Sequence, residues 1–205
     1  MDDEKNQRPE SSSGASVNGA LSSRTPRKSI LNKVISRRNS REWALQMLFR
    51  LDVASPETTL DDFFSEFWAL QFDVLEEFKE TDSAALEEFK KPTNNQYRSF
   101  AEKLVRGVWN NLGEIDSKIE GYLTNWTLPR MGGVDRNVLR LAFYELFFAE
   151  DTPPIVIINE AIDIAKYFST RESGKFVNGV LDRAKRDVSR NAREATRPLR
   201  RSKKQ

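Results

Sequence analysis

The sequence has no cysteine and no histidine. Without cysteine the chain can form no disulfide and no thiolate zinc site, and it has no cysteine nucleophile. Without histidine it also lacks the commonest general base and the commonest metal ligand. These absences argue against an enzyme, and we expect no cofactor and no metal.

Long hydrophobic runs are missing as well. No stretch approaches the roughly twenty apolar residues of a membrane-spanning helix, and no apolar run follows the N-terminal charges as in a secretory signal. We therefore expect no membrane segment and a cytoplasmic location. The 205 residues, with 38% hydrophobic and 31% charged side chains, are enough for one domain with solvated extensions.

Charge is distributed unevenly along the chain. Residues 24–41 contain seven Lys or Arg and no acid, and residues 183–205 contain ten against two acids, whereas residues 57–91 carry eleven acids and three lysines. Basic ends of this kind are typical either of solvated tails or of polyanion binding, and nucleic acid is the natural polyanion. Both interpretations stay open at this point.

Helical periodicity is strongest in residues 154–184. Apolar residues recur there at the i, i+3, i+4, i+7 spacing of one helical face, which predicts two short helices joined by a polar turn at 169–174. The first predicted face is Ile155, Ile158, Ala161, Ile162 and Ala165, and the second is Val177, Val180, Leu181 and Ala184.

Further helices are predicted upstream, and the sequence favours an all-α fold, a compact bundle of about seven helices. A first helix starting near Asn39 or Ser40 has Trp43, Ala44, Met47, Leu48 and Leu51 as its core face. The others span about 59–79, with many aromatic residues, 96–111, 115–126 and 134–146. Residues 1–36 and 187–205 are predicted to be disordered basic extensions. An acidic insertion is expected at about 73–95.

Three blocks of sequence carry a resemblance to a known family. They are RRNSREWALQMLFRLD at 37–52, VLRLAFYEL at 138–146, and INEAIDIAKYF with KFVNGVLD at 158–182. Together they resemble the NusB transcription antitermination family, over roughly residues 37–186. The resemblance implies an all-helical domain that binds boxA-type RNA together with NusE, a small-subunit ribosomal protein, within the RNA polymerase antitermination complex.

The resemblance also implies which residues bind. Arg37, Arg38 and Arg41 match the basic block that contacts RNA in the family, and Lys175 and Phe176 match its second RNA-facing position. Arginine suits this role because its planar fork of donors matches phosphate and can stack on unpaired bases. The surface that faces NusE is expected around Phe49 and Asp135.

Two alternatives are weighed against this hypothesis. The same domain occurs fused to an RNA cytosine methyltransferase, but only about twenty residues follow the last predicted helix, too few for a nucleotide-binding domain. Glu145, Glu160 and Asp163 are poor candidates for catalysis or metal binding because they lack imidazole partners. The second alternative is a helical protein-interaction module that touches RNA only through unspecific basic tails.

Overall fold

A computed structural model describes residues 36–54, 58–77, 90–91, 94–124, 126–149 and 151–188. Within these ranges the chain forms seven α-helices and two 3-10 turns, with no strand, which confirms the predicted all-α bundle. The elements are α1 (Arg37–Ala54), α2 (Leu60–Glu77), α4 (Asn95–Asn110), α5 (Leu112–Glu120), η2 (Leu128–Arg130), α6 (Gly133–Phe147), α7 (Pro154–Phe168), α8 (Arg171–Ala184) and η3 (Lys185–Asp187). The predicted disordered extensions lie outside the described residues, apart from Ser36 and residues 187–188.

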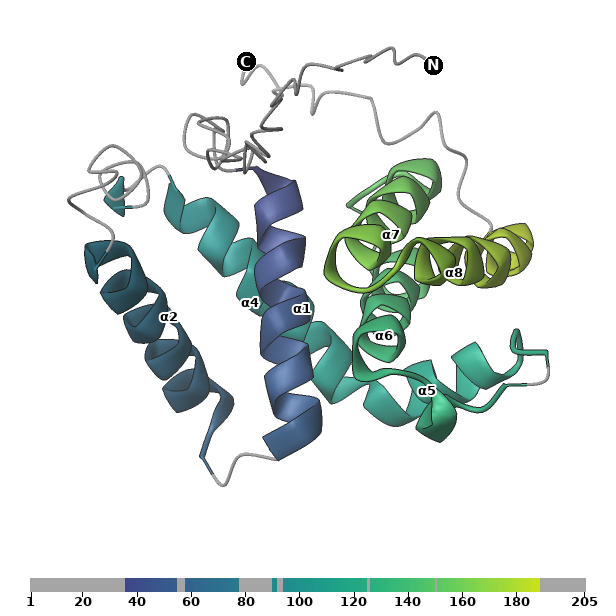
Figure 1. The fold of residues 1–205 in the computed structure, drawn as a ribbon, viewed down its shortest axis with the longest axis horizontal. Helices are drawn as coiled ribbons and strands as arrows, with labels where there is room; N and C mark the ends of the chain where they lie inside the picture. Colours follow the sequence, from purple (N-terminus) through teal and green to yellow (C-terminus); the bar gives the residue numbers. More distant parts are fainter. Residues whose placement is uncertain are drawn as a thin grey trace, which may run out of the picture.

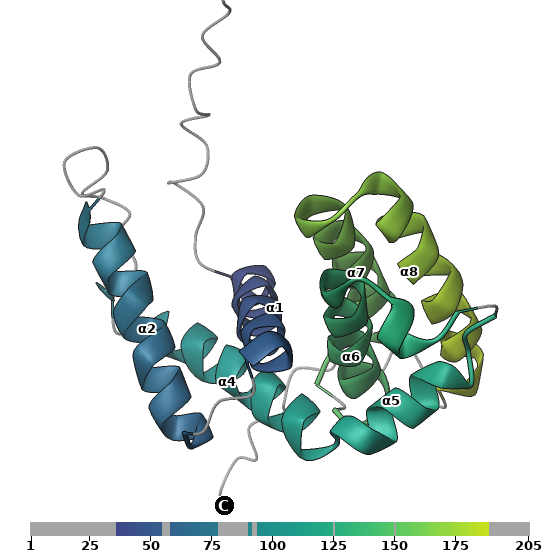
Figure 2. The same ribbon diagram turned by 60° about the horizontal axis from the view of Figure 1, so that its bottom comes forward.

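The helices form two groups that meet at α1 and α6 (Figure 1). Helices α1, α2 and α4 lie on one side, and α5, α6, α7 and α8 on the other, an arrangement that the turned view preserves (Figure 2). Helix α6 contacts α1, α4, α5, α7 and α8, so it is the central element of the bundle. Its middle is accordingly buried all round, from Asn137 to Leu146.

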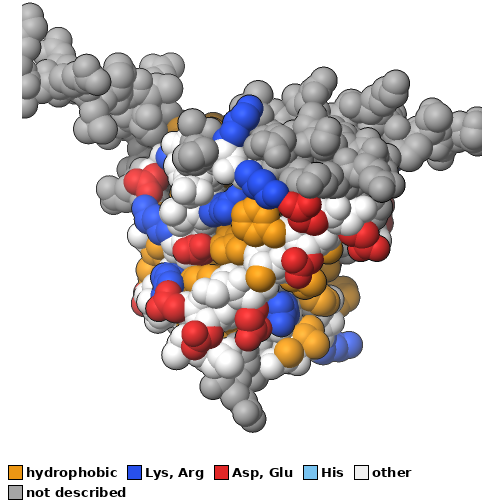
Figure 3. Space-filling model, turned by 90° about the vertical axis from the view of Figure 1, so that its left-hand side faces the viewer, with side chains coloured by type: hydrophobic (Ala, Val, Ile, Leu, Met, Phe, Trp, Pro, Cys, Tyr) orange, Lys and Arg blue, Asp and Glu red, His pale blue; other side chains and the backbone are white. Residues whose placement is uncertain are grey.

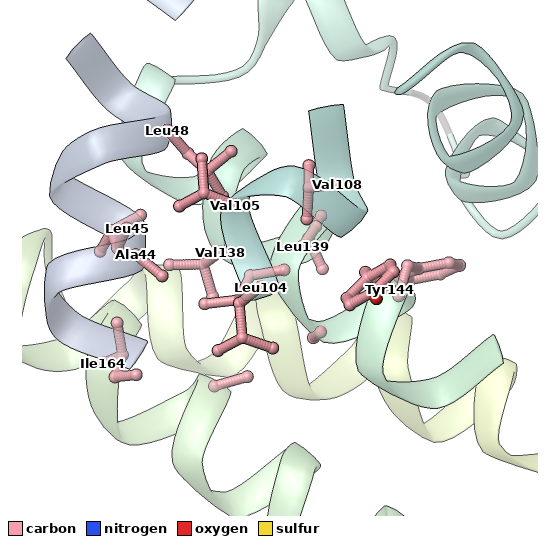
Figure 4. Close-up of a cluster of buried hydrophobic side chains, with 14 of the residues drawn as sticks. Ala44, Leu45, Leu48, Leu104, Val105, Val108, Val138, Leu139, Tyr144 and Ile164 are labelled. Atoms are coloured by element: carbon pink, nitrogen blue, oxygen red, sulfur yellow. The ribbon is translucent and has the colours of Figure 1, made fainter. Parts of the chain in front are cut away.

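Helix α1 begins at Arg37, two to three residues earlier than predicted, and Asn39 accepts hydrogen bonds from the backbone N–H and hydroxyl of Ser36. It packs against both α4 and α6, so its buried surface is wider than one helical face. For that reason Leu45, which falls outside the predicted core face, is 2% exposed. Figure 4 shows Leu45 and its neighbours among side chains from α4, α6 and α7.

The hairpin of α7 and α8 forms as predicted, but the core face of α7 is rotated. Ile158, Ala161 and Ala165 are buried as expected, whereas the other buried isoleucines are Ile157 and Ile164. Ile155 is 43% exposed and Ile162 only partly buried, so this part of the prediction is wrong. The rotation arises because α7 contacts α6 and α8 on adjacent sides. The predicted face of α8 is entirely buried.

Helix α5 ends at Glu120, and the prediction that it continues to Trp126 is wrong. Trp126 lies in the connection to η2 and is 52% exposed. Tyr122 and Leu123, which follow the helix, are partly buried against the core. The apolar spacing predicted that Tyr122 and Leu123 pack on the core from a helix, whereas they reach the core from the turn that follows α5.

Helix α2 joins the bundle through aromatic side chains. Phe63, Phe64, Phe67 and Trp68 are buried, and the ring of Trp68 meets Trp43 of α1 edge to face, with centroids 5.3 Å apart. The outer side of the molecule at α2 shows hydrophobic side chains among acidic and basic ones (Figure 3). Helix α2 runs to Glu77 and so includes the first five residues of the expected acidic insertion, while residues 78–89 and 92–93 of that insertion lie outside the described ranges.

Candidate nucleic-acid and partner interface

Arg37 stands at the first position of α1 and is exposed to solvent. Its guanidinium carbon lies 4.7 Å from the centroid of the Phe100 ring of α4, a cation–π contact that orients the side chain. Both residues line a surface hollow of about 250 Å³ together with Lys103. Cations at the N-terminus of a helix oppose its dipole, so local helix stability does not explain Arg37. Its guanidinium lies at the surface, at the edge of this hollow.

Arg38 has a different environment, since it lies among three carboxylates. Its Nε donates to Glu42 at 2.7 Å, and its Nη1 lies 3.5 Å from Glu160 and 3.8 Å from Asp163 of α7. The side chain is 23% exposed. Arg38 therefore joins α1 to α7 at the surface, and a phosphate would have to compete with these acids for it.

Arg41 is buried, with only 3% of its surface exposed. Its Nε and Nη2 donate to the two carboxylate oxygens of Glu145 at 2.7 Å each, and Nη2 also lies 3.4 Å from the hydroxyl of Thr152. Its Nη1 donates to the backbone carbonyl of Arg37 at 3.3 Å. In this conformation the guanidinium has no access to a phosphate, which favours a structural role for Arg41 over the expected direct RNA contact.

Lys175 and Phe176 lie in the first turns of α8, which Thr170 caps by accepting from the backbone N–H of Ser173 at 3.1 Å. The side chain of Lys175 is 64% exposed and pairs with Glu172 at 2.9 Å. Phe176 is partly buried and packs against the core. Part of Phe176 therefore contacts the core while the rest reaches the surface.

Asp135 lies in the first turn of α6, where a negative charge is favoured by the helix dipole. Its Oδ2 accepts a hydrogen bond from the hydroxyl of Ser173 at 3.0 Å, and its Oδ1 is covered from solvent without a hydrogen-bond partner. This contact joins the start of α6 to the start of α8. The residue expected to face a protein partner thus lies next to the residues expected to face RNA.

Phe49 of α1 is 41% exposed. Its ring lies against Gly133 at the start of α6, where an added Cβ would stand 2.9 Å from Cε2 of the ring. Glycine at this position therefore lets the ring lie directly on the backbone of α6. Phe49 thus lies against the same first turn of α6 that carries Asp135.

The residues predicted to contact RNA lie in two places, at the start of α1 and at the start of α8, with α7 between them (Figure 1). Lys166 of α7 fills part of that interval, because it lies 3.6 Å from Asp163 and packs closely on Gly174 of α8. A Cβ at Gly174 would stand 2.5 Å from Cγ of Lys166. Lys166 is not among the RNA-contacting residues predicted from the sequence. Its spacing one helical turn after Asp163 is typical of an exposed ion pair on a helix.

A groove of about 320 Å³ lies beside Lys175 and Phe176. It is lined by Trp126, Arg130, Met131, Gly132, Asp135, Thr170, Glu172, Ser173 and Phe176. Trp126 and Arg130 were not predicted from the sequence to line a surface groove. The predicted helix through 115–126 placed Trp126 in the core. The groove therefore draws on two loops and two helix starts that are distant in sequence.

A second buried network fixes the geometry of this region. Asp52 of α1 accepts hydrogen bonds from Arg136, Asn137 and Arg140 of α6, at 2.5 to 3.1 Å. Arg140 also donates to both carboxylate oxygens of Asp116 in α5, at 2.7 and 2.8 Å. Burial alone would raise the pKa of Asp52, but the two guanidinium groups outweigh it, and the pKa is lowered. The network ties α1, α5 and α6 together.

The carboxylates considered for catalysis or metal binding are divided between two arginines. Glu145 is paired with Arg41, whereas Glu160 and Asp163 lie around Arg38. Across the described residues, no three carboxylates gather into a group that could hold a metal ion. No helix in the described part of the chain is both long and apolar enough to cross a membrane.

Comparison with known proteins supports the resemblance seen in the sequence. The sequence model of the NusB family matches residues 38–186. The transcription antitermination protein NusB of Syntrophotalea carbinolica is 45% identical over 151 residues, which are 73% of this chain and 92% of the relative. NusB of Pelotomaculum thermopropionicum is 40% identical over 149 residues, which are 73% of this chain and 88% of the relative.

Solved structures agree with these relatives. T. maritima NusB aligns with a TM-score of 0.58 at 36% identity, over 77% of this chain and 96% of that one. A crystal structure of the antitermination factors NusB and NusE in complex with double-stranded RNA aligns with a TM-score of 0.56 at 28% identity, over 74% of this chain and 96% of that one. The chain therefore belongs to the NusB family of transcription antitermination proteins.

Proposed function

We propose that this protein is a transcription antitermination factor that binds boxA-type single-stranded RNA together with NusE, and so supports processive transcription of ribosomal RNA operons. The observation that carries the proposal is the exposed guanidinium of Arg37 on the Phe100 ring, since Arg37 directly precedes the part of the chain, residues 38–186, that matches the family. A relative crystallised with NusE and RNA supports both partners. The factor acts without catalysis, in the cytoplasm, as part of the RNA polymerase antitermination complex.

RNA contacts are assigned to the exposed cations on either side of α7. Arg37 and Lys175 supply direct phosphate contacts, Arg38 contributes by exchanging a carboxylate partner for phosphate, and Phe176 offers part of its ring to an unstacked base. Such a mixture of cations and aromatic faces is typical of single-strand binding. Arg41 supports the surface from inside, because its pairing with Glu145 and its bond to the carbonyl of Arg37 fix the first turn of α1.

The NusE-facing surface is assigned to Phe49 and the start of α6 near Asp135. An aromatic ring that is 41% exposed, beside a polar helix start, has the composition expected of an anchor in a protein interface. Because Asp135 also contacts Ser173 of α8, this surface is continuous with the RNA-facing start of α8. Adjacent surfaces for the two partners favour a joint complex.

The test is a titration of labelled boxA-like RNA and of a scrambled RNA, with and without NusE, at two salt concentrations. We expect tighter binding of the boxA-like RNA, strengthened by NusE. Replacing Arg37 by Ala should remove roughly 0.7 from the slope of log affinity against log salt, the share of one phosphate contact on a single strand. The control is Lys90→Ala, which removes an exposed cation paired with Glu76 at the end of α2.

The second candidate function is the interaction module with unspecific basic tails, favoured by ten cations in residues 183–205. It predicts equal affinity for both RNAs under every condition, and a salt slope that Arg37→Ala leaves unchanged. Either result would contradict sequence-preferring binding at the structured surface.

A further inference from the structure

We propose that the groove between η2 and the start of α8 is a nucleobase site, in which an unstacked RNA base lies on the ring of Trp126 and the neighbouring phosphate is held by Arg130. The inference rests on the proposed function, because it extends the RNA path from Lys175 and Phe176. It adds two residues to which neither the family blocks nor the named relatives assign a role.

Trp126 supplies the stacking surface. It is 52% exposed, whereas Trp68 is 8% exposed and Trp43 and Trp109 are partly buried. Its ring centroid lies 6.1 Å from that of Phe176, with 57° between the planes, so the two rings form an angled wall along the groove. A separation of 6.1 Å between tilted rings leaves no room for a base between them. A base therefore stacks on the solvent-facing side of Trp126.

Arg130 supplies the phosphate contact. Its side chain is exposed and lines the same groove, and within the described part of the chain it has no ion pair or side-chain hydrogen bond. A guanidinium with free donors beside an exposed aromatic ring is the pairing that single-stranded nucleic acid requires, one group for the backbone and one for the base.

The loop that carries Arg130 is held in place before any ligand binds. Arg136 donates through Nη1 to the backbone carbonyls of Leu128 and Met131, at 3.3 and 3.2 Å, on either side of Arg130. Arg136 is itself fixed by Asp52. Because this loop is already ordered, Arg130 loses less conformational entropy on binding than an arginine on an unrestrained surface loop would lose.

Within the described part of the chain, neither carboxylate on the groove forms an ion pair with Arg130. Asp135 accepts from Ser173 through Oδ2 while its Oδ1 is covered, and Glu172 pairs with Lys175. The volume of about 320 Å³ falls within the roughly 300–1,000 Å³ typical of small-molecule sites. One flat base fits such a groove, and continuity with Lys175 and Phe176 favours RNA as its occupant.

The experiment compares the full chain with Trp126→Ala, Trp126→Phe and Arg130→Ala in titrations of labelled boxA-like RNA without NusE. Losing one base–aromatic stack should weaken binding about 5- to 150-fold in Trp126→Ala, while Trp126→Phe keeps most of the affinity. Arg130→Ala should reduce the salt slope by roughly 0.7, whereas Lys90→Ala leaves affinity and slope unchanged. Bound RNA should quench the tryptophan fluorescence of the wild type far more than that of Trp126→Phe.

The outcomes separate this inference from the proposed function. If the wild type prefers boxA-like RNA but the Trp126 and Arg130 variants bind it equally well, the groove site is overturned and the function stands. If a parallel titration with NusE shows that these variants lose only NusE binding, the groove is a protein-facing surface and the inference is again overturned. If the wild type shows no preference for boxA-like RNA, the function fails first. Circular dichroism checks that each variant is folded, and the fluorescence quenching of the wild type reports on Trp126 without any substitution.

Discussion

Arg41 and Glu145 form a two-pronged ion pair, with both guanidinium–carboxylate distances at 2.7 Å, that joins α1 to α6 inside the bundle. Both side chains are almost fully buried, at 4% and 3% exposure. A buried guanidinium must be paired, because leaving either charge alone in the interior costs several kcal/mol. The pair makes Arg41 part of the interior that joins α1 to α6.

Arg41→Ala should therefore destabilise the fold by about 3–5 kcal/mol, because it leaves Glu145 buried without its partner. Chemical denaturation followed by circular dichroism measures this. A matched control is Arg37→Ala, which removes an exposed guanidinium and should change stability by less than about 1 kcal/mol. An Arg41→Met, Glu145→Leu double variant should recover much of the loss, since an apolar pair of similar size leaves no buried charge. Equal stability of the two single variants would contradict the structural role.

Gly107→Ala should destabilise the protein although the change adds only one methyl group. A Cβ at Gly107 of α4 would stand 1.9 Å from Cζ of Tyr144 in α6, and the tyrosine ring is itself buried and stacked on Phe148. The helices would have to separate or the ring to leave its place, which costs about 1–3 kcal/mol or more. Gly113→Ala is the control, because nothing lies within 4 Å of its added Cβ. Similar melting temperatures for both variants would refute the close contact.

Asp52 should make the stability of the fold depend on pH in the acid range. Arg136 and Arg140 hold the pKa of Asp52 below its ordinary value against the opposing effect of burial. A lowered pKa in the folded state gives a contribution that is fully present above the unfolded pKa, near 4. The contribution is lost as the pH falls through the folded value. Asp52→Asn should therefore flatten the decline of unfolding free energy below about pH 4.

The control for this prediction is Asp182→Asn, which changes an exposed carboxylate of α8 that accepts a hydrogen bond from Asn178 and pairs with no arginine or lysine among the described residues. Denaturant titrations between pH 2 and 6 should give the wild-type slope for Asp182→Asn and a shallower one for Asp52→Asn. Identical slopes for wild type and Asp52→Asn would show that the carboxylate is not linked to folding.

Sequence periodicity predicted the helices well where one face of a helix packs against its neighbours. All four predicted core residues of α8 are buried. It was less accurate for α1 and α7, where Leu45, Ile157 and Ile164 are buried although they lie outside the predicted core faces. A single stripe at helical spacing cannot tell which adjacent side a second helix will cover.

The candidate site was predicted only in part for a related reason. The family blocks identified Arg37, Lys175 and Phe176, which reach the surface, but Arg41 belongs to the same basic block and is buried. Its partner Glu145 lies 104 residues away, so local sequence gives no sign of the pairing. The groove of Trp126 and Arg130 likewise depends on α8 packing beside η2, a tertiary contact that no local pattern contains.

Phe49→Ala should weaken NusE binding by at least about 2 kcal/mol, the threshold for an interface anchor, because its ring is 41% exposed on the start of α6. Affinity for boxA-like RNA in the absence of NusE should stay unchanged, since the ring lies three helical turns from Arg37. Calorimetric titration with NusE measures the first effect and RNA titration the second. The control is Val53→Ala, which trims a 70% exposed apolar residue one turn further along α1. If Phe49→Ala binds NusE normally but loses affinity for RNA, Phe49 belongs to the RNA-binding surface and not to the partner surface.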